Sequence, residues 1–437
     1  MSSITEATTV LSQLRIFWKR IVRGTAWTSL GAAASQGASL AAGIIIARLM
    51  GKDTYGRFGL IQTTIAVWSL IAGFGLSLTA TRYLSRYRLT EAVEAGSVIG
   101  ATTTLSLILA GGTSLCLFLG AGALSFSLSG RGDLAGELRV AALSMFVLSL
   151  VGVQQGILTG FEAFRGAALL NVARAVLLLP LTVLGIHFAG LSGALWAITI
   201  ASSAGMVLGA SLIASECRAH GIQPQWGVRR ADWKMISSFA LPAFLGGLLV
   251  TPVNWLVSAL LVRSSGGYGQ MAILTAGVYF RTAFMFFQGA TGTVLLPVFS
   301  SSSGRDREAF LWAAVKTNSF VSLCGFGLAL LAPNRLMRIF GPGFNGNGTV
   351  VVVNLAAGGL MLASAPLVYW LASVGRQWAV ARSNAVWAAV YGVTAWFAIS
   401  RGWAALGVAS ASLFAYTVQT GYYVWVFRRA RIQELTL

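Results

Sequence analysis

The sequence contains twelve apolar stretches, each long enough to cross a lipid bilayer as an α-helix. A transmembrane helix needs roughly 20 mostly apolar residues, because the hydrocarbon core is about 30 Å thick. Backbone polar groups find no water inside that core, so a chain of this kind crosses it as helices. To within a few residues, the predicted spans are 25–47, 58–80, 95–118, 138–160, 166–187, 191–214, 235–262, 271–298, 310–332, 348–372, 377–399 and 403–427.

The composition is that of a polytopic, all-α membrane protein. The chain is 56% hydrophobic and only 10% charged, whereas a soluble domain carries about 25% charged residues. In a soluble protein the net charge of +19 would suggest a nucleic-acid partner, but basic residues in short inner loops set membrane topology instead. We therefore expect no nucleic-acid partner. The three Cys and two His residues are scattered, and they predict neither a metal site nor a cofactor.

Lys and Arg residues are distributed unevenly between the two sides of the predicted bundle. If the N-terminus is inside, the inner segments hold more than twice as many of them as the outer loops. This asymmetry predicts a multi-pass membrane protein with both termini in the cytoplasm. Residues 1–24 alternate basic and apolar side chains and predict an interfacial amphipathic segment. The apolar stretch that follows is too long for a signal-peptide core, so we expect no cleavage.

The two halves of the chain share a repeat. Three pairs of matching positions lie in nearly one register: Tyr55-Gly56 with Tyr268-Gly269 at 213 residues, Asn171 with Asn384 at 213, and Gly193 with Gly407 at 214. Six spans is an even number, so the copies share one orientation and are related by an axis along the membrane normal, with a site between them. The predicted parts are an N-terminal segment, an N-lobe, a linker and a C-lobe with a short basic tail, at 1–24, 25–214, 215–234 and 235–437.

Five cations fall within predicted spans, and no carboxylate does. The cations are Arg139, Arg174, Arg281, Lys316 and Arg382, whereas all twelve acidic residues lie in loops or at span ends. A charge at the bilayer centre costs about 2.5–3.5 kcal/mol on insertion scales. Arg174 is near the middle of its span, so we expect it to face a protein interior or a water-filled cavity.

These cations suggest an electropositive cavity for an anionic headgroup. The guanidinium fork of arginine matches phosphate oxygens, and we place Arg174 and Arg281 near mid-depth, with Lys316 and Arg382 nearer the cytoplasmic face. The alternative is that each cation snorkels or binds backbone carbonyls. Two amides within the spans, Asn171 and Gln288, are further candidates for ligand binding. The other polar residues of the spans, Gln62, Asn254 and Asn354 among them, are expected to form hydrogen bonds between helices.

Two prolines, Pro242 and Pro252, fall in the seventh span. Each removes a backbone hydrogen bond and permits a bend, which predicts either a static kink or a hinge at the start of the second lobe. No nucleophile elbow, phosphate loop or pair of catalytic carboxylates is present, so we do not predict an enzyme.

Short motifs in the first half resemble those of bacterial polysaccharide flippases. They are Ile44-Ile45-Ile46-Ala47-Arg48-Leu49-Met50-Gly51, Tyr55-Gly56-Arg57-Phe58-Gly59-Leu60, Gly73-Phe74-Gly75-Leu76, Ala80-Thr81-Arg82-Tyr83-Leu84 and Gly190-Leu191-Ser192-Gly193-Ala194. The family is the O-antigen (Wzx-type) transporters of the multidrug/oligosaccharidyl-lipid/polysaccharide (MOP) exporter superfamily. The resemblance implies two six-helix lobes in a V that opens alternately to either side. It also implies transfer of undecaprenyl-pyrophosphate-linked sugars from the inner to the outer leaflet of the bacterial inner membrane, with Asn171 and Gln288 as candidates for binding sugar hydroxyls.

The resulting prediction is a monomeric flippase for lipid-linked oligosaccharide, in contact with membrane lipids and serving exopolysaccharide, capsule or O-antigen synthesis. A polysaccharide polymerase and export machinery would act after it. A cation-coupled multidrug exporter is the first alternative, although such proteins typically carry intramembrane carboxylates. A lipid II flippase usually has fourteen spans, and a membrane polymerase or glycosyltransferase needs a larger outer loop. The energy source, which could be proton, sodium or membrane potential, stays open.

Overall fold

The computed structural model of the chain is α-helical, without strands among the residues that it describes. It describes the backbone of residues 2–130, 132–230, 232–233, 240–241, 244–245, 247–301 and 304–435, and their side chains except 2–25, 283–294, 296–298, 300–301, 304–305, 328, 377 and 431–435. The elements are α1 (Ser2–Gly73), α2 (Leu76–Tyr87), α3 (Ala92–Ser129), α4 (Ala135–Gly160), α5 (Phe164–Ala219), α7 (Thr251–Arg263), α8 (Gly267–Ser301), α9 (Gly304–Leu331), α10 (Pro333–Arg338), the 3-10 turn η1 (Pro342–Phe344), α11 (Gly348–Ser373), α12 (Gln377–Ser400) and α13 (Ala404–Leu435).

The helices α1 and α5 each contain two predicted spans, joined where a glycine breaks the helical path. Gly51 has φ 81° and Gly190 has φ 57°, a backbone region that glycine enters without steric cost. The predicted segment 1–24 is the first part of α1 and continues directly into the first span, and its side chains lie outside the described residues.

The bend in α5 requires a close backbone approach. A Cβ atom on Gly193 would lie 1.8 Å from the carbonyl oxygen of Gly185, so only glycine fits there. The last two spans repeat this arrangement, because a Cβ atom on Gly407 would lie 2.8 Å from the Cβ atom of Ala398. Gly185 and Ala398 are 213 residues apart, in the register of the predicted repeat.

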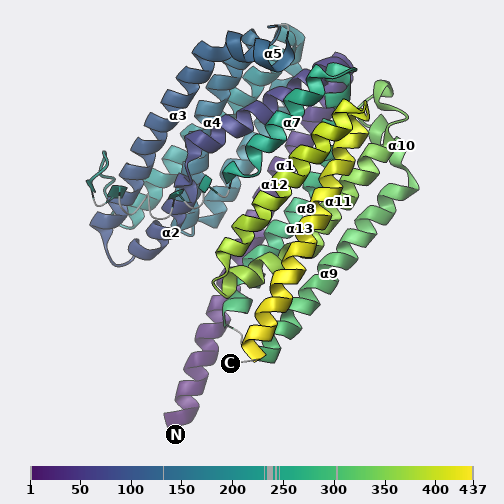
Figure 1. Cartoon of the computed structure of the whole chain (residues 1–437). Helices are drawn as coiled ribbons and strands as arrows, with labels where there is room; N and C mark the ends of the chain where they lie inside the picture. The colour runs from purple at the N-terminus through teal and green to yellow at the C-terminus, as the bar shows by residue number, and fades with distance from the viewer. Residues whose placement is uncertain are drawn as a thin grey trace.

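Two helical lobes form a V, as Figure 1 shows. Helices α1–α5 make up the N-lobe and α7–α13 the C-lobe, with α1 and α8 packed together at the junction. The lobes meet at one end, called here the closed end, and diverge toward the end that carries both termini, the terminal end (Figure 1). The predicted fold of about twelve spans in two six-helix lobes is confirmed.

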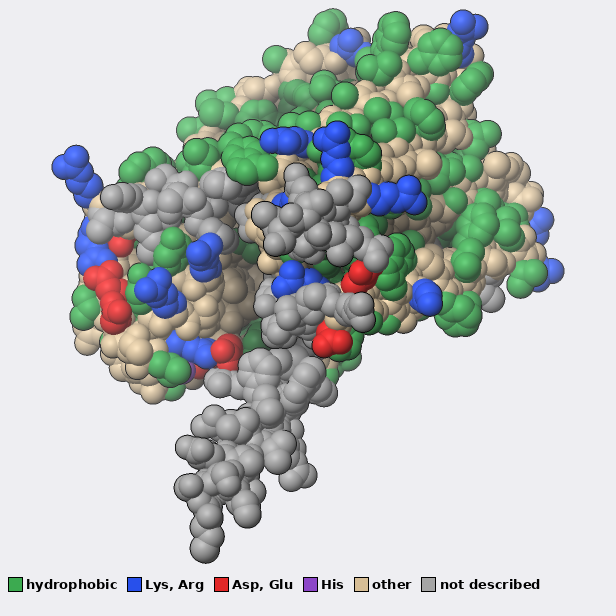
Figure 2. Space-filling model, turned by 60° about the horizontal axis from the view of Figure 1, so that its bottom comes forward, with side chains coloured by type: hydrophobic (Ala, Val, Ile, Leu, Met, Phe, Trp, Pro, Cys, Tyr) green, Lys and Arg blue, Asp and Glu red, His purple; other side chains and the backbone are tan. Residues whose placement is uncertain are grey.

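The surface suits a lipid environment. Six helices within the described residues are long and apolar enough to cross a membrane, and two of these contain the bends in α1 and α5. Large apolar side chains point outward from several spans, among them Phe188 at 80% exposure, Leu119 at 73% and Phe320 at 68%. Toward the terminal end, Figure 2 shows more basic than acidic side chains among those described.

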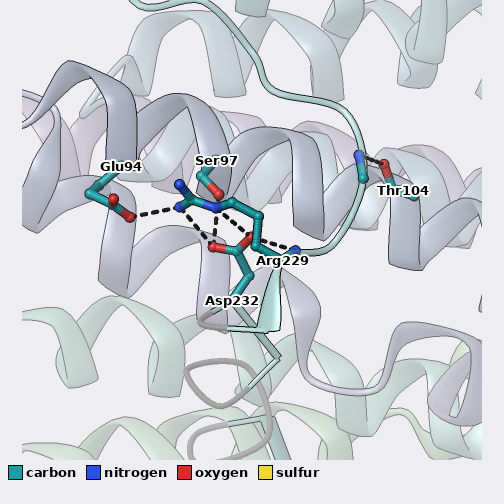
Figure 3. Close-up of polar contacts among 6 residues, drawn as sticks. Glu94, Ser97, Thr104, Arg229 and Asp232 are labelled. Atoms are coloured by element: carbon teal, nitrogen blue, oxygen red, sulfur yellow. Dashed lines mark hydrogen bonds and ion pairs between the residues drawn. The ribbon is translucent and has the colours of Figure 1, made fainter.

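The inter-lobe linker runs along α3. The backbone N–H of Gln225 donates to the carbonyl of Gly96 at 3.0 Å, and the N–H of Gly227 donates to the Thr104 hydroxyl at 3.2 Å (Figure 3). A Cβ atom on Gly100 would lie 1.8 Å from the Gln225 carbonyl oxygen. The small residues of α3 therefore form the surface that receives the linker.

A polar network at the end of the linker holds it on α3 (Figure 3). Asp232 is buried and accepts hydrogen bonds from the Ser97 hydroxyl at 2.7 Å and from Arg229 Nε at 3.1 Å. Arg229 also donates to Glu94 at 2.8 Å. Burial alone would raise the pKa of Asp232, but the hydrogen bonds from Arg229 and Ser97 outweigh it and hold that pKa below its usual range.

Asp232→Asn is expected to loosen the linker. Because its charged partner Arg229 is partly exposed and screened by solvent, the free energy of unfolding at neutral pH should fall by only about 1–2 kcal/mol. A carboxyl with a lowered folded pKa stabilises the protein above its unfolded pKa of about 3.9, and that contribution disappears as pH falls through the folded pKa. The difference in thermal unfolding between variant and wild type should therefore shrink on acidification, and trypsin should cut faster after Arg229 and Arg230.

The control for this experiment is Glu91→Gln, because Glu91 is an exposed carboxylate at the start of α3, the helix along which the linker runs. It should match the wild type in both measurements. An Asp232→Asn protein with wild-type unfolding and wild-type cleavage at neutral pH would show that the network does not hold the linker.

A cationic cavity between the lobes

Two adjoining cavities lie between the lobes. One has a volume of about 200 Å³ and is lined mainly by N-lobe residues, and the other has about 420 Å³ and is lined mainly by C-lobe residues. Both are lined by Gln62 of α1 and Tyr279 of α8. Tyr279 reaches across the junction, since a Cβ atom on Gly43 of α1 would lie 3.5 Å from its ring. The two cavities therefore adjoin at the junction of the lobes, and together they are called here the central cavity.

Arg174 lines the N-lobe cavity from α5. Its aliphatic stem lies over Gly205, where a Cβ atom would come within 2.5 Å of the arginine Cγ. One terminal nitrogen donates to the Ser202 hydroxyl at 3.3 Å, while Nε is buried without a hydrogen-bond partner. A guanidinium carries five N–H donors, so most of the hydrogen-bonding capacity of Arg174 is free for a ligand in the cavity.

Arg281 lines the C-lobe cavity from α8. Its guanidinium donates to the Ser412 hydroxyl on α13 at 2.9 Å. Tyr391 of α12 and Tyr416 of α13 line the same cavity. The two cations thus come from opposite lobes, and each is held by a neutral hydroxyl rather than by a carboxylate.

The described lining of both cavities contains no Asp or Glu. An arginine in a low-dielectric site without a counter-ion attracts an anion strongly. The remaining polar groups of the C-lobe cavity are hydroxyls and amides, which suit hydrogen bonds to sugar hydroxyls. They include Thr63, Thr251, Asn254, Ser258, Thr282 and Asn354.

The structure brings together only part of the predicted set. Arg174 and Arg281 line the central cavity, but Lys316 is exposed on α9, on the face that carries the exposed Trp312 and Phe320. Arg382 is exposed and lines a separate pocket between α12 and α13. These two cations lie outside the cavity because their helical positions face outward.

The other predicted residues are placed as follows. Asn171 is half-buried on α5 and is absent from the cavity lining. Pro252 occupies the first turn of α7 after a break at residues 249–250, a position where its missing N–H leaves no hydrogen bond unmade. The Gln288 side chain and Pro242 lie outside the described residues. The hinge function of both prolines stays a prediction.

Several lining residues are absent from the predicted set. Three of them are tyrosines well inside apolar spans: Tyr279, Tyr391 and Tyr416. Interfacial tyrosines lie at span ends, so their position in the sequence could have identified them as candidate cavity residues. Three amides expected to form hydrogen bonds between helices also line the C-lobe cavity: Gln62, Asn254 and Asn354. The Asn254 and Asn354 side chains donate instead to carbonyls four residues earlier in the chain, those of Val250 and Val350. No sequence pattern distinguishes Ser202 and Ser412 from other serines of the spans.

The closed end is built from the two repeated Tyr-Gly segments, each of which contacts the opposite lobe. Tyr55 is fully buried, with ring centroids 5.5 Å from Phe340 and 5.9 Å from Phe344 in the C-lobe. Conversely, the Tyr268 hydroxyl donates to Asp133 of the N-lobe at 3.0 Å. The internal repeat thus gives the closed end a reciprocal contact between lobes.

An ion pair reinforces this end. Arg57 lies 2.9 Å from Asp133 and places its guanidinium 5.0 Å from the centre of the Tyr268 ring. Although partial burial acts to raise the pKa of Asp133, its hydrogen bonds, including that from Tyr268, and the charge of Arg57 together lower it. Asp133 is therefore ionised at neutral pH and holds Arg57 and Tyr268 together.

Comparison with known proteins gives a consistent result. The chain is 25% identical over 405 residues to the EPS I polysaccharide export inner membrane protein EpsE of Ralstonia solanacearum, covering 89% of each chain. It is 23% identical over 328 residues to the lipid III flippase of Escherichia coli strain K12, covering 72% of this chain and 78% of that one.

Solved structures show the same fold. A MOP superfamily transporter from Pyrococcus furiosus, described as having reverse polarity of its binding pocket, superposes with a TM-score of 0.73 at 19% identity and 96% coverage of both chains. An outward-facing multidrug resistance MATE family transporter gives a TM-score of 0.72 at 18% identity, with 96% of both chains covered.

The family described as "Polysaccharide biosynthesis protein" matches residues 21–303, which is more than half of the chain. With this match, the relatives above and the two-lobed fold, the predicted resemblance is confirmed. The chain belongs to the polysaccharide biosynthesis protein family and is a Wzx-type, multi-pass membrane transporter of the MOP superfamily.

Proposed function

We propose that the protein flips undecaprenyl-pyrophosphate-linked oligosaccharide from the inner to the outer leaflet of the bacterial inner membrane. The observation that carries this proposal is the pair of adjoining cavities between the lobes, one lined by Arg174 and the other by Arg281, with no acidic residue in the described lining of either. Such a site suits a ligand that carries negative charge next to hydroxyl groups. A pyrophosphate-linked sugar has both.

The mechanism that follows is alternating access. The pyrophosphate would bind the two guanidinium groups, and the sugars would bind the hydroxyls and amides of the C-lobe cavity. The polyprenyl tail would stay in the lipid. The closed end would then part while the terminal end closes, so that the headgroup is released on the other side. With both termini in the cytoplasm, as the distribution of basic residues predicts, the state described here would be the inward-open one.

Binding across the lobes gives the substrate a way to bias this transition. A ligand shifts a conformational equilibrium only through a difference in affinity between the two states. Arg174 and Arg281 stand on different lobes, so a rocking motion changes the distance between them and with it the fit to a pyrophosphate. Membrane potential acting on the anionic headgroup could add about 2.3 kcal/mol per charge at 100 mV.

A cation-coupled multidrug exporter is the alternative that the fold alone permits. The positive cavity argues against it, because unpaired arginines repel cationic drugs and the described lining offers no carboxylate to carry a proton or sodium ion. A lipid II flippase would share the chemistry of the headgroup, but such proteins usually have fourteen spans. A polymerase would need a larger outer loop. We propose a monomer that delivers substrate to a separate polymerase and to export machinery.

The test uses a strain in which this gene is deleted and the sugar pathway is intact. We expect polyprenyl-pyrophosphate oligosaccharide to accumulate on the cytoplasmic leaflet and surface polysaccharide to be lost, and the wild-type chain should reverse both. Unchanged lipid-linked sugar, together with new sensitivity to cationic dyes, would instead identify a drug exporter.

A further inference from the structure

A second cationic pocket lies in the C-lobe, near its terminal end. It has a volume of about 330 Å³ and is formed between α12 and α13. None of its lining residues lines the central cavity, so the two sites are separate. The side chains that matter for its chemistry are three arginines and three aromatic residues: Arg376, Arg382, Arg429, Trp378, Tyr422 and Trp425.

The arginines of this pocket present positive charge to the outside. Arg382 and Arg429 are exposed, and within the part of the chain that the structure describes neither has a carboxylate at ion-pair distance. The guanidinium of Arg429 lies 4.4 Å from the centre of the Trp425 ring, a cation–π contact that fixes its position. Arginines held apart on two packed helices leave a gap that suits a phosphate group.

The aromatic residues place this pocket at the boundary between lipid and water. Trp378 is 76% exposed and Trp425 is 49% exposed. Tryptophans with such exposure on a membrane helix belong at the level of the headgroups. The pocket lies where α12 begins and α13 approaches its end, both at the terminal end. A ligand in this pocket would therefore lie at the level of the lipid headgroups.

We propose that this pocket binds the phosphate headgroup of an anionic phospholipid from the adjacent leaflet. Basic pockets between transmembrane helices on the cytoplasmic side of a membrane, where the distribution of basic residues predicts the terminal end to lie, are suited to anionic lipid headgroups. The described lining offers few neutral polar groups for a sugar and shares no residue with the central cavity, which favours a phospholipid over the oligosaccharide substrate. This inference concerns a lipid site of its own and does not depend on what the protein transports.

The experiment titrates the detergent-solubilised full chain with phosphatidylglycerol or phosphatidylcholine and counts bound lipids by native mass spectrometry. Wild type should bind one phosphatidylglycerol in preference to phosphatidylcholine. Each basic side chain near an anionic lipid contributes about fivefold to affinity, so Arg382→Gln/Arg429→Gln should bind phosphatidylglycerol roughly 30-fold more weakly. The two single variants should each lose about fivefold, which preserves the test if the double variant does not fold.

The matched control is Arg86→Gln/Arg428→Gln. It removes the same charge from two exposed arginines that do not line this pocket, and it should keep wild-type lipid binding. Equal losses in both double variants would show a non-specific charge effect and overturn the site. Equal binding of the two lipids by wild type would overturn it as well. Displacement of phosphatidylglycerol by millimolar inorganic phosphate would show a site for free phosphate and reject the lipid assignment.

Discussion

Arg174→Gln is expected to abolish export of lipid-linked oligosaccharide while leaving membrane insertion intact. Glutamine keeps hydrogen-bonding capacity but removes the charge that faces the N-lobe cavity. A charge-assisted hydrogen bond contributes about 1.5–3 kcal/mol, so headgroup binding should weaken roughly 10- to 150-fold. The measurement is accumulation of the lipid-linked sugar in the deletion strain carrying the variant, compared with the same strain carrying the wild type.

Two further variants make this result interpretable. Arg174→Lys should retain part of the activity, since lysine keeps the charge but lacks the planar fork that matches phosphate. Lys316→Gln is the matched control, because it removes a cation from within a span that the structure places on an exposed face. We expect Lys316→Gln to export like the wild type. If the inserted Arg174→Gln protein also did so, Arg174 would have no function in the cavity.

Much of the fold could be predicted because the membrane imposes simple rules on sequence. The apolar stretches gave the spans, and the matching Tyr-Gly segments gave the parallel repeat. The structure extends the repeat to close packing, with Gly407 against Ala398 where Gly193 lies against Gly185. The path of the linker along α3 could not be predicted, because it depends on glycines that read in sequence as ordinary residues of a span.

The candidate site could be predicted only in part, for a physical reason. A charge within a span has to avoid lipid, which directs attention to Arg174 and Arg281, but sequence depth does not give the direction in which a side chain points. Lys316 is also within a span, yet its side chain is exposed on α9, twelve residues after the start of that helix. A lysine in that position can lay its apolar stem along the helix surface and extend its ammonium group toward the interface. Rotation about the helix axis decides between these outcomes, and it is set by packing against neighbouring helices.

Gly56→Ala is expected to prevent the lobes from closing at the end opposite the termini. The added Cβ atom would lie 1.8 Å from the Tyr268 carbonyl oxygen of the opposite lobe, so the backbone has to move. Overpacking of this kind costs about 1–3 kcal/mol. Because the contact joins the two lobes, that cost should fall on the state in which the closed end is shut. The equilibrium between the two states should then shift roughly 5- to 150-fold toward the state in which this end is open and the terminal end is shut, and export should fall as a result.

The shift can be measured between spin labels at Leu119 on α3 and Leu331 on α9, both exposed near the closed end, after replacement of Cys116, Cys217 and Cys324. We expect Gly56→Ala to lengthen this distance, as measured by double electron–electron resonance. Gly122→Ala is the control, since a Cβ atom on Gly122 would have open space around it. A Gly56→Ala protein with the wild-type distance and wild-type export would mean that the Tyr-Gly contact is not part of the gate. If Gly56→Ala lengthens the distance and abolishes export while Arg174 and Arg281 are unchanged, the loss of export is due to the gate and not to weaker substrate binding.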